Sequence, residues 1–340
     1  MQQPILKISL GQLQKNTQFF KEHTTAKLCG VVKADAYGHG ATDIAQFLEP
    51  LVDYFAVATV QEGVQLRLAG IKKRILVFTP ATCKLEVLEM LQYALIASIT
   101  DIQDYILLQK ILLQENRVLV AHIKVNTGMN RYGFNLPDFQ EFCKSKLSDR
   151  IQIEGIYSHF YYVQQVDRTK GQFLKFMQFA NRAEKVFGKL IKHIVATGGF
   201  FLDKEYHLDM VRIGLGLYGY LPNEQHIVEI QPIMQLCANV IADKKYCNGG
   251  AGYSIYRPKS KHIATIRLGY ADGLYYQKTA KIPPCMDCQV LEGEYKKYQV
   301  IPNFLNFESY AKANNTIVYD VLTSFGNRIQ RDYLFDFFLD

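Results

Sequence analysis

Strand-like and helix-like segments alternate over about the first 220 residues, and this alternation constrains the fold more than any other feature of the sequence. Runs of apolar and β-branched residues alternate with segments of helical periodicity such as KLEVLEMLQY and GQFLKFMQFANRAEKVF. The eight predicted strands are 28–33, 54–60, 74–79, 95–99, 117–125, 151–159, 191–196 and 210–218. Eight strands with intervening helices predict an α/β fold with an N-terminal (β/α)8 TIM-type barrel. A doubly wound open sheet is the alternative, but its G-x-G-x-x-G fingerprint does not follow an early strand.

The character of the chain changes after Tyr220, where helical periodicity fades. Strands are predicted at 227–241, 251–256, 261–268 and 285–290, between turns rich in Pro, Gly and Asn. The segment ANNTIVYDVLTSF predicts one helix near the C-terminus. We therefore predict a barrel domain at 9–220 and a C-terminal mostly-β domain at 221–340, with residues 1–8 pairing with the latter.

Composition narrows the class of protein. With 340 residues, 49% hydrophobic and 21% charged, the chain is globular and long enough for a large core. The net charge of +7 is scattered, which argues against nucleic-acid binding but suits an anionic small ligand. We expect no membrane association and a cytoplasmic location, because the sequence lacks a signal-like N-terminus and a long apolar segment. Seven cysteines suit a reducing compartment, and the lone C-x-x-C at Cys285 and Cys288 predicts no metal site.

Lys33 is the first candidate for chemistry, in the stretch VVKADAYGHG. A lysine ending a buried strand is costly to keep charged, so burial should lower its pKa and leave an amine nucleophile. Tyr37 is expected near a helix N-terminus, where free N–H groups favour phosphate. A lysine beside a phosphate site suits an aldehyde cofactor with a phosphate tail, and a structural lysine is the alternative.

Further polar residues follow the other predicted strands. In a barrel, the loops after the strands build the active site, so these residues should meet at one rim. They are Lys124, Arg131, His159, Thr197 with Gly198, and Arg212 with Gly214. Each alone has a structural explanation, such as a core histidine or an ion-pair partner. Together they predict an active site.

Several motifs resemble the alanine racemases, the fold-type III enzymes that depend on pyridoxal 5'-phosphate. They are, in order, VVKADAYGHG, HIKVNTGMNRYGF, YSHF, VRIGLGLYG, AGYSIY, IATIRLGYADG, CMD and RIQRDY. The resemblance spans about residues 5 to 335 and implies an isomerase that interconverts L-alanine and D-alanine, which supplies D-alanine for peptidoglycan. It also implies a homodimer with shared active sites.

The same resemblance implies roles for single residues. Lys33 and Tyr253 of the partner subunit would be the two catalytic bases, one on each face of the substrate. Substrate binding falls to Arg131, Tyr270 and Met286. Cofactor binding falls to Lys33, Tyr37, His159, Thr197, Gly198, Arg212, Gly214, Leu215 and Tyr333. Racemisation removes a proton from one face and returns it on the other, so two opposed bases suit the reaction.

Two cationic residues have distinct consequences. The Arg212 guanidinium only donates hydrogen bonds, so a pyridine nitrogen facing it should stay unprotonated, which limits side reactions such as transamination. Lys124 and Arg131 would repel each other unless one is neutralised. In the family this lysine can carry a carbamate formed with carbon dioxide, so we predict a carbamylated Lys124.

The sequence departs from the family pattern in two places. Gly198 stands where the family usually has a serine that helps to bind phosphate, and the chain is shorter between Gly273 and Cys285 and after Val290. A broad-specificity racemase of small amino acids is an alternative function, and a noncatalytic carrier of the cofactor is another. The carrier has no use for a β domain with Tyr253. The Asp and Cys motifs of fold-type III decarboxylases are not evident.

Overall fold

The computed structural model describes residues 3–145, 147–222, 227–276, 280–326 and 328–336. Contacts between Cα atoms divide the chain into two compact units. The barrel unit comprises residues 14–36 and 41–231. The β unit comprises residues 1–13, 37–40 and 232–340.

The barrel unit contains a strand at each of the eight predicted positions. They are β2 (Lys27–Val31), β3 (Tyr54–Val57), β4 (Arg74–Val77), β5 (Ala97–Ile99), β6 (Leu119–Lys124), β7 (Ile151–Tyr157), β8 (Ile191–His193) and β9 (Met210–Ile213). Two parallel sheets have the orders β4-β3-β2-β9 and β5-β6-β7-β8. Parallel bridges Leu76–Ile96 and Ala196–Arg212 join the sheets at both edges. The eight strands therefore form a closed ring, which confirms the predicted barrel.

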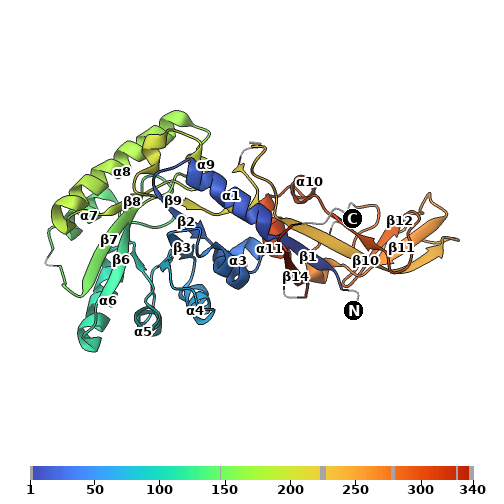
Figure 1. Ribbon diagram of the computed structural model, residues 1–340, viewed down its shortest axis with the longest axis horizontal. Helices are drawn as coiled ribbons and strands as arrows, with labels where there is room; N and C mark the ends of the chain where they lie inside the picture. The colour runs from blue at the N-terminus through green and yellow to red at the C-terminus, as the bar shows by residue number, and fades with distance from the viewer. Residues whose placement is uncertain (1–2, 146, 223–226, 277–279, 327, 337–340) are drawn as a thin grey trace. The chain divides into compact units, whose positions relative to one another are not determined.

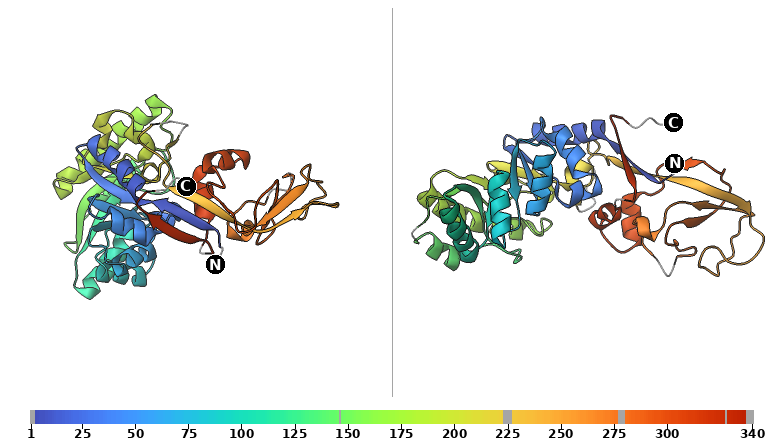
Figure 2. Two further views of the ribbon diagram at one scale, coloured as in Figure 1. Left: turned by 45° about the vertical axis from the view of Figure 1, so that its right-hand side comes forward. Right: turned by 90° about the horizontal axis from the view of Figure 1, so that it is seen from below.

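Helices lie on the outside of this ring (Figures 1 and 2). They are α3 (Ala41–Leu48), α4 (Val60–Leu68), α5 (Lys84–Gln92), α6 (Ile102–Glu115), α7 (Leu136–Phe142), α8 (Val166–Phe187) and the short α9 (Thr197–Phe200). The helix α1 (Leu10–Glu22) precedes β2. Two 3₁₀ turns, η1 (Lys204–His207) and η2 (Leu215–Tyr218), come just before and just after β9. In α8, Phe173, Phe176, Phe179, Ala180 and Ala183 are buried. Their spacing of three to four residues forms one apolar face, as the periodicity of that segment predicted.

The β unit holds a mixed sheet in the order β12-β11-β10-β1-β14, with β13 paired to β10. Its strands are β1 (Ile5–Ser9), β10 (Met234–Lys245), β11 (His262–Ile266), β12 (Gln289–Glu292), β13 (Val300–Ile301) and β14 (Gln330–Leu334). The N-terminal strand β1 pairs antiparallel with β10 and parallel with β14. Two helices, α10 (Phe307–Ala313) and α11 (Val318–Ser324), and the turn η4 (Tyr270–Asp272) complete the unit.

Some predicted elements are wrong in detail. The predicted strand 251–256 is absent except for a single bridge between Ala251 and Ser254, because Gly249 and Gly252 adopt positive φ angles of 89° and 58° and form turns. The strand expected from residue 227 begins only at Met234, after Pro232, which has no N–H to donate to a sheet. The strand expected to run to residue 218 ends at Ile213. Near the C-terminus α11 lies within the segment predicted to be helical, and α10, which precedes that segment, was not predicted.

None of the helices in the described ranges is long and apolar enough to cross a lipid bilayer.

Gly216 lies in a tightly packed position after β9, and its replacement should destabilise the barrel unit. A Cβ atom at Gly216 would lie 2.4 Å from Cζ of Phe20 and 3.0 Å from Cγ2 of Thr197, both of which are buried. Overpacking of this kind costs about 1–3 kcal/mol, so we expect Gly216→Ala to lower the free energy of unfolding by that amount in urea titrations.

Gly171 provides the matched control for this change. It lies in α8 without a positive φ angle, and a Cβ atom there would meet no described atom within 4 Å beyond its own helix backbone and chain neighbours. Because alanine favours the helix over glycine, Gly171→Ala should raise the free energy of unfolding by about 0.5–1 kcal/mol. An unchanged stability for Gly216→Ala would contradict the tight packing described above.

Candidate active site

The segment that follows β2 has an unusual backbone. Lys33 begins the turn α2 (Lys33–Gly38), in which the residues from Ala34 to Tyr37 have φ angles of 52° to 55°. This is a left-handed turn, which costs about 1–2 kcal/mol per non-glycine residue. The helix α3 begins at Ala41, four residues after Tyr37, so the predicted helix N-terminus is present, whereas the left-handed turn at Lys33–Gly38 was not predicted.

Glu62 holds this strained turn in place. Its Oε1 atom accepts a hydrogen bond of 2.7 Å from the N–H of Ala34, and its Oε2 atom accepts from the N–H groups of Ala58 and Thr59. Asp35 adds a second restraint, because its Oδ1 atom accepts from the N–H of Ala41 at 2.8 Å. Backbone strain that is fixed in this way is typical of functional sites.

The Lys33 side chain is half-buried among cations. Burial lowers the pKa of its ammonium group, Arg131 and Arg212 lower it further, and Glu62 opposes them. A larger share of Lys33 is therefore the neutral amine than for a surface lysine. A neutral amine can act as a nucleophile or as a base.

Arg212, in β9, is buried and held by several partners. Its Nη2 atom donates to the carbonyl oxygens of Ser158, at 2.8 Å, and Ile194, at 3.3 Å. Its Nη1 atom lies 2.8 Å from Nδ1 of His193, and Nη2 lies 3.5 Å from Nδ1 of His159. Burial lowers the pKa of Arg212 to about 10, so the guanidinium remains charged at neutral pH. The charge is therefore fixed in position.

Lys124, the last residue of β6, is buried without an anionic partner. Its Nζ atom lies 4.6 Å from the ring centroid of Tyr157 and 6.0 Å from that of Tyr132. Within the described ranges it makes no ion pair and no hydrogen bond. Burial, Arg212 and Arg131 lower the pKa of Lys124 well below its usual range. The lowered pKa favours the neutral amine over the ammonium form, because cations lie nearby.

Several backbone N–H groups that donate no hydrogen bond within the described residues lie just after β8 and β9. The bridge between Ala196 and Arg212 places the turn at Gly198 beside the turn at Gly214 and Leu215, and the Thr197 hydroxyl accepts from the N–H of Gly216 at 3.2 Å. In the part of the chain that the structure describes, the N–H groups of Gly198, Gly214 and Leu215 have no acceptor. Clustered free N–H groups form a site for an anion such as phosphate.

Arg131 is exposed in the segment after β6, with its guanidinium carbon 4.9 Å from the centroid of the Tyr132 ring, and the remaining predicted site residues lie in the β unit. The Tyr333 hydroxyl donates to the carbonyl oxygen of His39 at 2.9 Å, and Tyr37 is buried with its ring 5.5 Å from that of Tyr319. Tyr253 is 79% exposed. Tyr270 and Met286 lie close together, because the N–H groups of Tyr270 and Ala271 donate to the carbonyl oxygens of Cys285 and Met286.

Three residues that sequence reasoning did not select also build the site. Glu62 fixes the left-handed turn, and the Thr59-x-x-Glu62 capping box was a visible signal for it. Tyr157 stacks on His193 at a centroid distance of 4.9 Å, and Arg212 lies 5.5 Å from the centroid of the Tyr157 ring. No local pattern distinguishes Tyr157 and His193 from other buried ring residues.

Comparison with known proteins shows the family of this chain. Residues 8–222 match the family model for the N-terminal domain of alanine racemase. The chain is 34% identical to alanine racemase 1 of Caldanaerobacter subterraneus subsp. tengcongensis, over 91% of this chain and 89% of the relative. It is 33% identical to the alanine racemase of Francisella philomiragia, over 97% and 100% of the two chains. This chain belongs to the alanine racemase family.

A solved structure supports the same fold for the alanine racemase family and this chain. The alanine racemase of Clostridium difficile 630 superposes with a TM-score of 0.87 and 28% identity, covering 98% of this chain and 96% of that one. The predicted architecture of an N-terminal barrel and a C-terminal mostly-β domain is therefore confirmed. Members of the alanine racemase family are isomerases, and this chain is therefore an isomerase.

Proposed function

We propose that this protein is a pyridoxal 5'-phosphate-dependent alanine racemase that interconverts L-alanine and D-alanine. The observation that carries the proposal is the joint presence, at one rim of the barrel, of the low-pKa amine of Lys33, the fixed Arg212 guanidinium and free N–H groups. These groups meet the three needs of the cofactor, which are an amine for its aldehyde, a partner for its ring nitrogen and a site for its phosphate.

The residues present fit the cofactor. Lys33 would hold it covalently, and the N–H groups of Gly198, Gly214 and Leu215 would hold its phosphate without the hydroxyl of a serine at position 198. Further phosphate contacts would fall to Tyr37, Tyr333 and Thr197, while His159 would flank the ring and Arg212 would face the ring nitrogen. When bound, the cofactor withdraws electrons from the substrate and makes the Cα proton acidic.

The protein would move this proton with two bases. Lys33 serves one face of the substrate, and Tyr253 of the partner subunit serves the other. Each base contributes on the order of 10²–10⁴ in rate. Arg131 binds the substrate carboxylate and positions the phenol of Tyr253, while Tyr270 and Met286 line the entrance. The chain between Gly273 and Cys285 is shorter than in the family, so we expect a difference in accepted substrate size; residues 277–279 of this segment lie outside the described residues.

A homodimer with shared active sites is part of the proposal. In the β unit, Tyr253 is 79% exposed, Ile255 97% and Met286 52%. A Cβ atom at Gly252 would lie 3.6 Å from the Cys285 sulfur, so the two segments that carry these side chains are neighbours in space. A patch of exposed apolar side chains is typical of a surface that a partner covers. A second copy of the chain would cover these residues and bring Tyr253 to the site. The barrel domain at 9–220 would then hold the cofactor, and the β domain at 221–340, with residues 1–8, would complete the neighbouring site.

The proposed substrate and product indicate the cellular role of the enzyme. D-alanine made in this way supplies peptidoglycan, and a cytoplasmic enzyme without nucleic-acid or membrane partners suits this role. A racemase that also accepts serine or other small amino acids is the second candidate, because of the shortened chain near the substrate entrance.

We expect Lys124 to carry a carbamate. Addition of carbon dioxide to its neutral amine releases one proton and converts the side chain into an anion, which then attracts Arg131 and Arg212. Protein equilibrated with ¹³C-labelled bicarbonate should show one carbamate signal in ¹³C NMR spectra, and Lys124→Met protein should lack it. Wild-type protein without this signal would show a plain amine.

The proposed function is tested by incubating purified, cofactor-loaded protein with single L-amino acids in deuterated water. We expect L-alanine to become racemic, with deuterium at Cα. Comparable rates with serine would favour the broad-specificity racemase. Cofactor binding without any exchange at Cα would favour the noncatalytic carrier and would overturn the proposal.

A further inference from the structure

A chain of hydrogen-bonded side chains runs through the buried interior of the barrel unit from Arg212. The Nη1 atom of Arg212 lies 2.8 Å from Nδ1 of His193, and Nε2 of His193 lies 2.9 Å from Nδ1 of His122. The Nε2 atom of His122 lies 3.4 Å from Oε1 of Glu154. Both imidazoles are fully buried, whereas the Glu154 side chain is 15% exposed.

Elementary hydrogen-bond chemistry fixes the direction of this chain. A guanidinium only donates, so Nδ1 of His193 must be the acceptor and its proton must be on Nε2. This proton is donated to Nδ1 of His122, so the proton of His122 is also on Nε2 and is donated to the Glu154 carboxylate. Burial lowers the pKa of both histidines. Arg212 lowers the pKa of His193 further, whereas Glu154 opposes the lowering for His122 without reversing it, so the neutral form of both rings is favoured.

Glu154 reaches this position because of an irregularity in its strand. Ala121 pairs with Ile153 and His122 pairs with Gly155, so Glu154 is an extra, unpaired residue in β7. Such a β-bulge changes the direction of a side chain. The next residue must be glycine, since a Cβ atom at Gly155 would lie 2.7 Å from two atoms of the His122 ring. The β-bulge and Gly155 therefore bring the Glu154 carboxylate and the His122 imidazole within hydrogen-bonding distance of each other.

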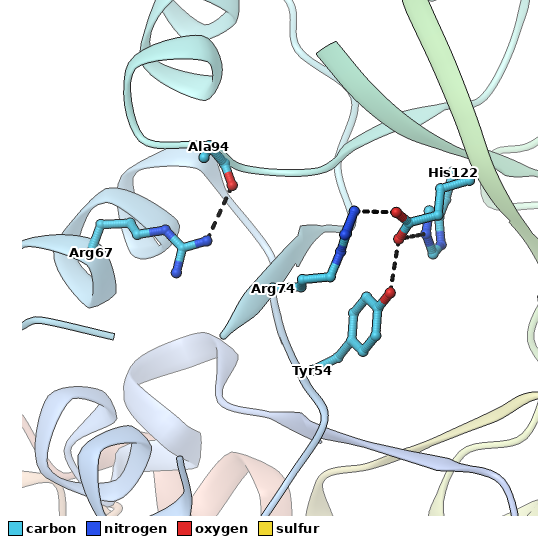
Figure 3. Close-up of polar contacts among 6 residues, drawn as sticks. Tyr54, Arg67, Arg74, Ala94 and His122 are labelled. Carbon is cyan, nitrogen blue, oxygen red and sulfur yellow. Dashed lines mark hydrogen bonds and ion pairs between the residues drawn. The ribbon is translucent and has the colours of Figure 1, made fainter. Parts of the chain in front are cut away.

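The carboxylate is itself held by two residues that begin neighbouring strands. Figure 3 shows Tyr54, Arg74 and His122 converging on one carboxylate, which the hydrogen bonds identify as that of Glu154. The Tyr54 hydroxyl donates to Oε1 at 2.8 Å, and Arg74 pairs with Oε2. Tyr54 and Arg74 are the first residues of β3 and β4, so this cluster lies toward the amino ends of the strands, away from the rim that carries Lys33.

We propose that Glu154 is a positioning residue for Arg212 and acts on it through His122 and His193. The proposal rests on the proposed function, in which Arg212 faces the ring nitrogen of the cofactor. As the terminal acceptor, Glu154 holds both imidazoles in the Nε2–H form and so keeps an acceptor nitrogen toward the guanidinium. Arg212 then has a fixed orientation at the cofactor ring.

Loss of the Glu154 acceptor should reverse the chain. In Glu154→Leu, the Nε2–H group of His122 has no acceptor, which favours the Nδ1–H tautomer of that ring. Two donors would then face each other between His122 and His193, and the conflict is relieved when His193 also takes the Nδ1–H form. A second conflict between donors then arises at Arg212, because Nδ1–H of His193 faces the guanidinium, and Arg212 loses one hydrogen bond and its fixed orientation.

Histidine tautomers in the full-length protein, read by ¹H–¹⁵N NMR with ¹⁵N-labelled histidine, test the proposal with and without cofactor. We expect both His122 and His193 of the wild-type protein to carry the proton on Nε2. We expect Glu154→Leu to convert both to Nδ1–H, with kcat about tenfold lower and KM within about twofold. Glu154→Gln retains an acceptor oxygen and should restore the wild-type tautomers.

Two controls separate this role from a structural ion pair. Arg74→Met and Tyr54→Phe remove the other partners of the carboxylate but leave it in place, so the tautomers should not change. An Nδ1–H form of either histidine in the wild-type protein would overturn the proposal, even if Glu154→Leu failed to fold. So would an unchanged His193 tautomer in folded Glu154→Leu. The tautomers are read without activity, so a failure of the proposed racemase function is distinguishable from a failure of this inference.

Discussion

Lys33→Ala is expected to reduce the racemisation rate by at least about 10⁴-fold, the largest effect of any single substitution in this protein. The change removes the amine that would hold the cofactor and one of the two proposed bases. We also expect the visible absorbance band of the lysine-linked cofactor to disappear. Racemisation followed by circular dichroism of alanine and the visible spectrum of the purified protein measure the two effects.

Lys110→Ala is the control for this prediction. Lys110 is an exposed residue of α6, so its loss should leave both activity and absorbance unchanged. The local fold should survive Lys33→Ala, because the left-handed turn is held by the carboxylates of Glu62 and Asp35 rather than by the lysine side chain. Retention of the lysine-linked absorbance band in Lys33→Ala would mean that another residue holds the cofactor.

Tyr253→Phe is expected to separate proton exchange from inversion. The substitution removes one of the two proposed bases and keeps the ring. Lys33 should then still exchange the Cα proton of one enantiomer, although the opposite face receives no proton. We expect racemisation to fall by about 10²–10⁴-fold, while one enantiomer still incorporates deuterium from deuterated water without inversion. Equal losses of exchange for both enantiomers would argue against a base at this position.

A mixing experiment tests whether the two bases come from different subunits. Lys33→Ala and Tyr253→Ala proteins are each expected to be inactive. After subunit exchange, a mixed dimer contains one site with both bases intact and one site with neither. Because about half of randomly exchanged dimers are mixed, about a quarter of the wild-type activity should return. No recovery after confirmed exchange would show that both bases belong to one subunit.

The sequence was sufficient for much of the fold. The eight predicted strand segments are short runs rich in apolar and β-branched residues, so local composition indicates where each one lies. The strand predicted at 251–256 is wrong because two glycines with positive φ turn the chain there, and apolar neighbours do not report a backbone angle. The roles of the predicted site residues remain predictions, although the structure places Lys33, Lys124, His159, Arg212 and the Gly214 turn at the ends of barrel strands or just after them.

The sequence by itself determined the alternation of strands and helices, the barrel that follows from it and the family to which the chain belongs. Only the tertiary structure decided the left-handed turn after Lys33, which has no glycine among its first four positive-φ residues and depends on Glu62, 28 residues away. The tertiary structure alone also decided that the Glu154 carboxylate faces the His122 ring. The physical reason is the same in both cases: the partners that hold these conformations come from other helices and strands of the barrel unit, and they meet only when the barrel closes.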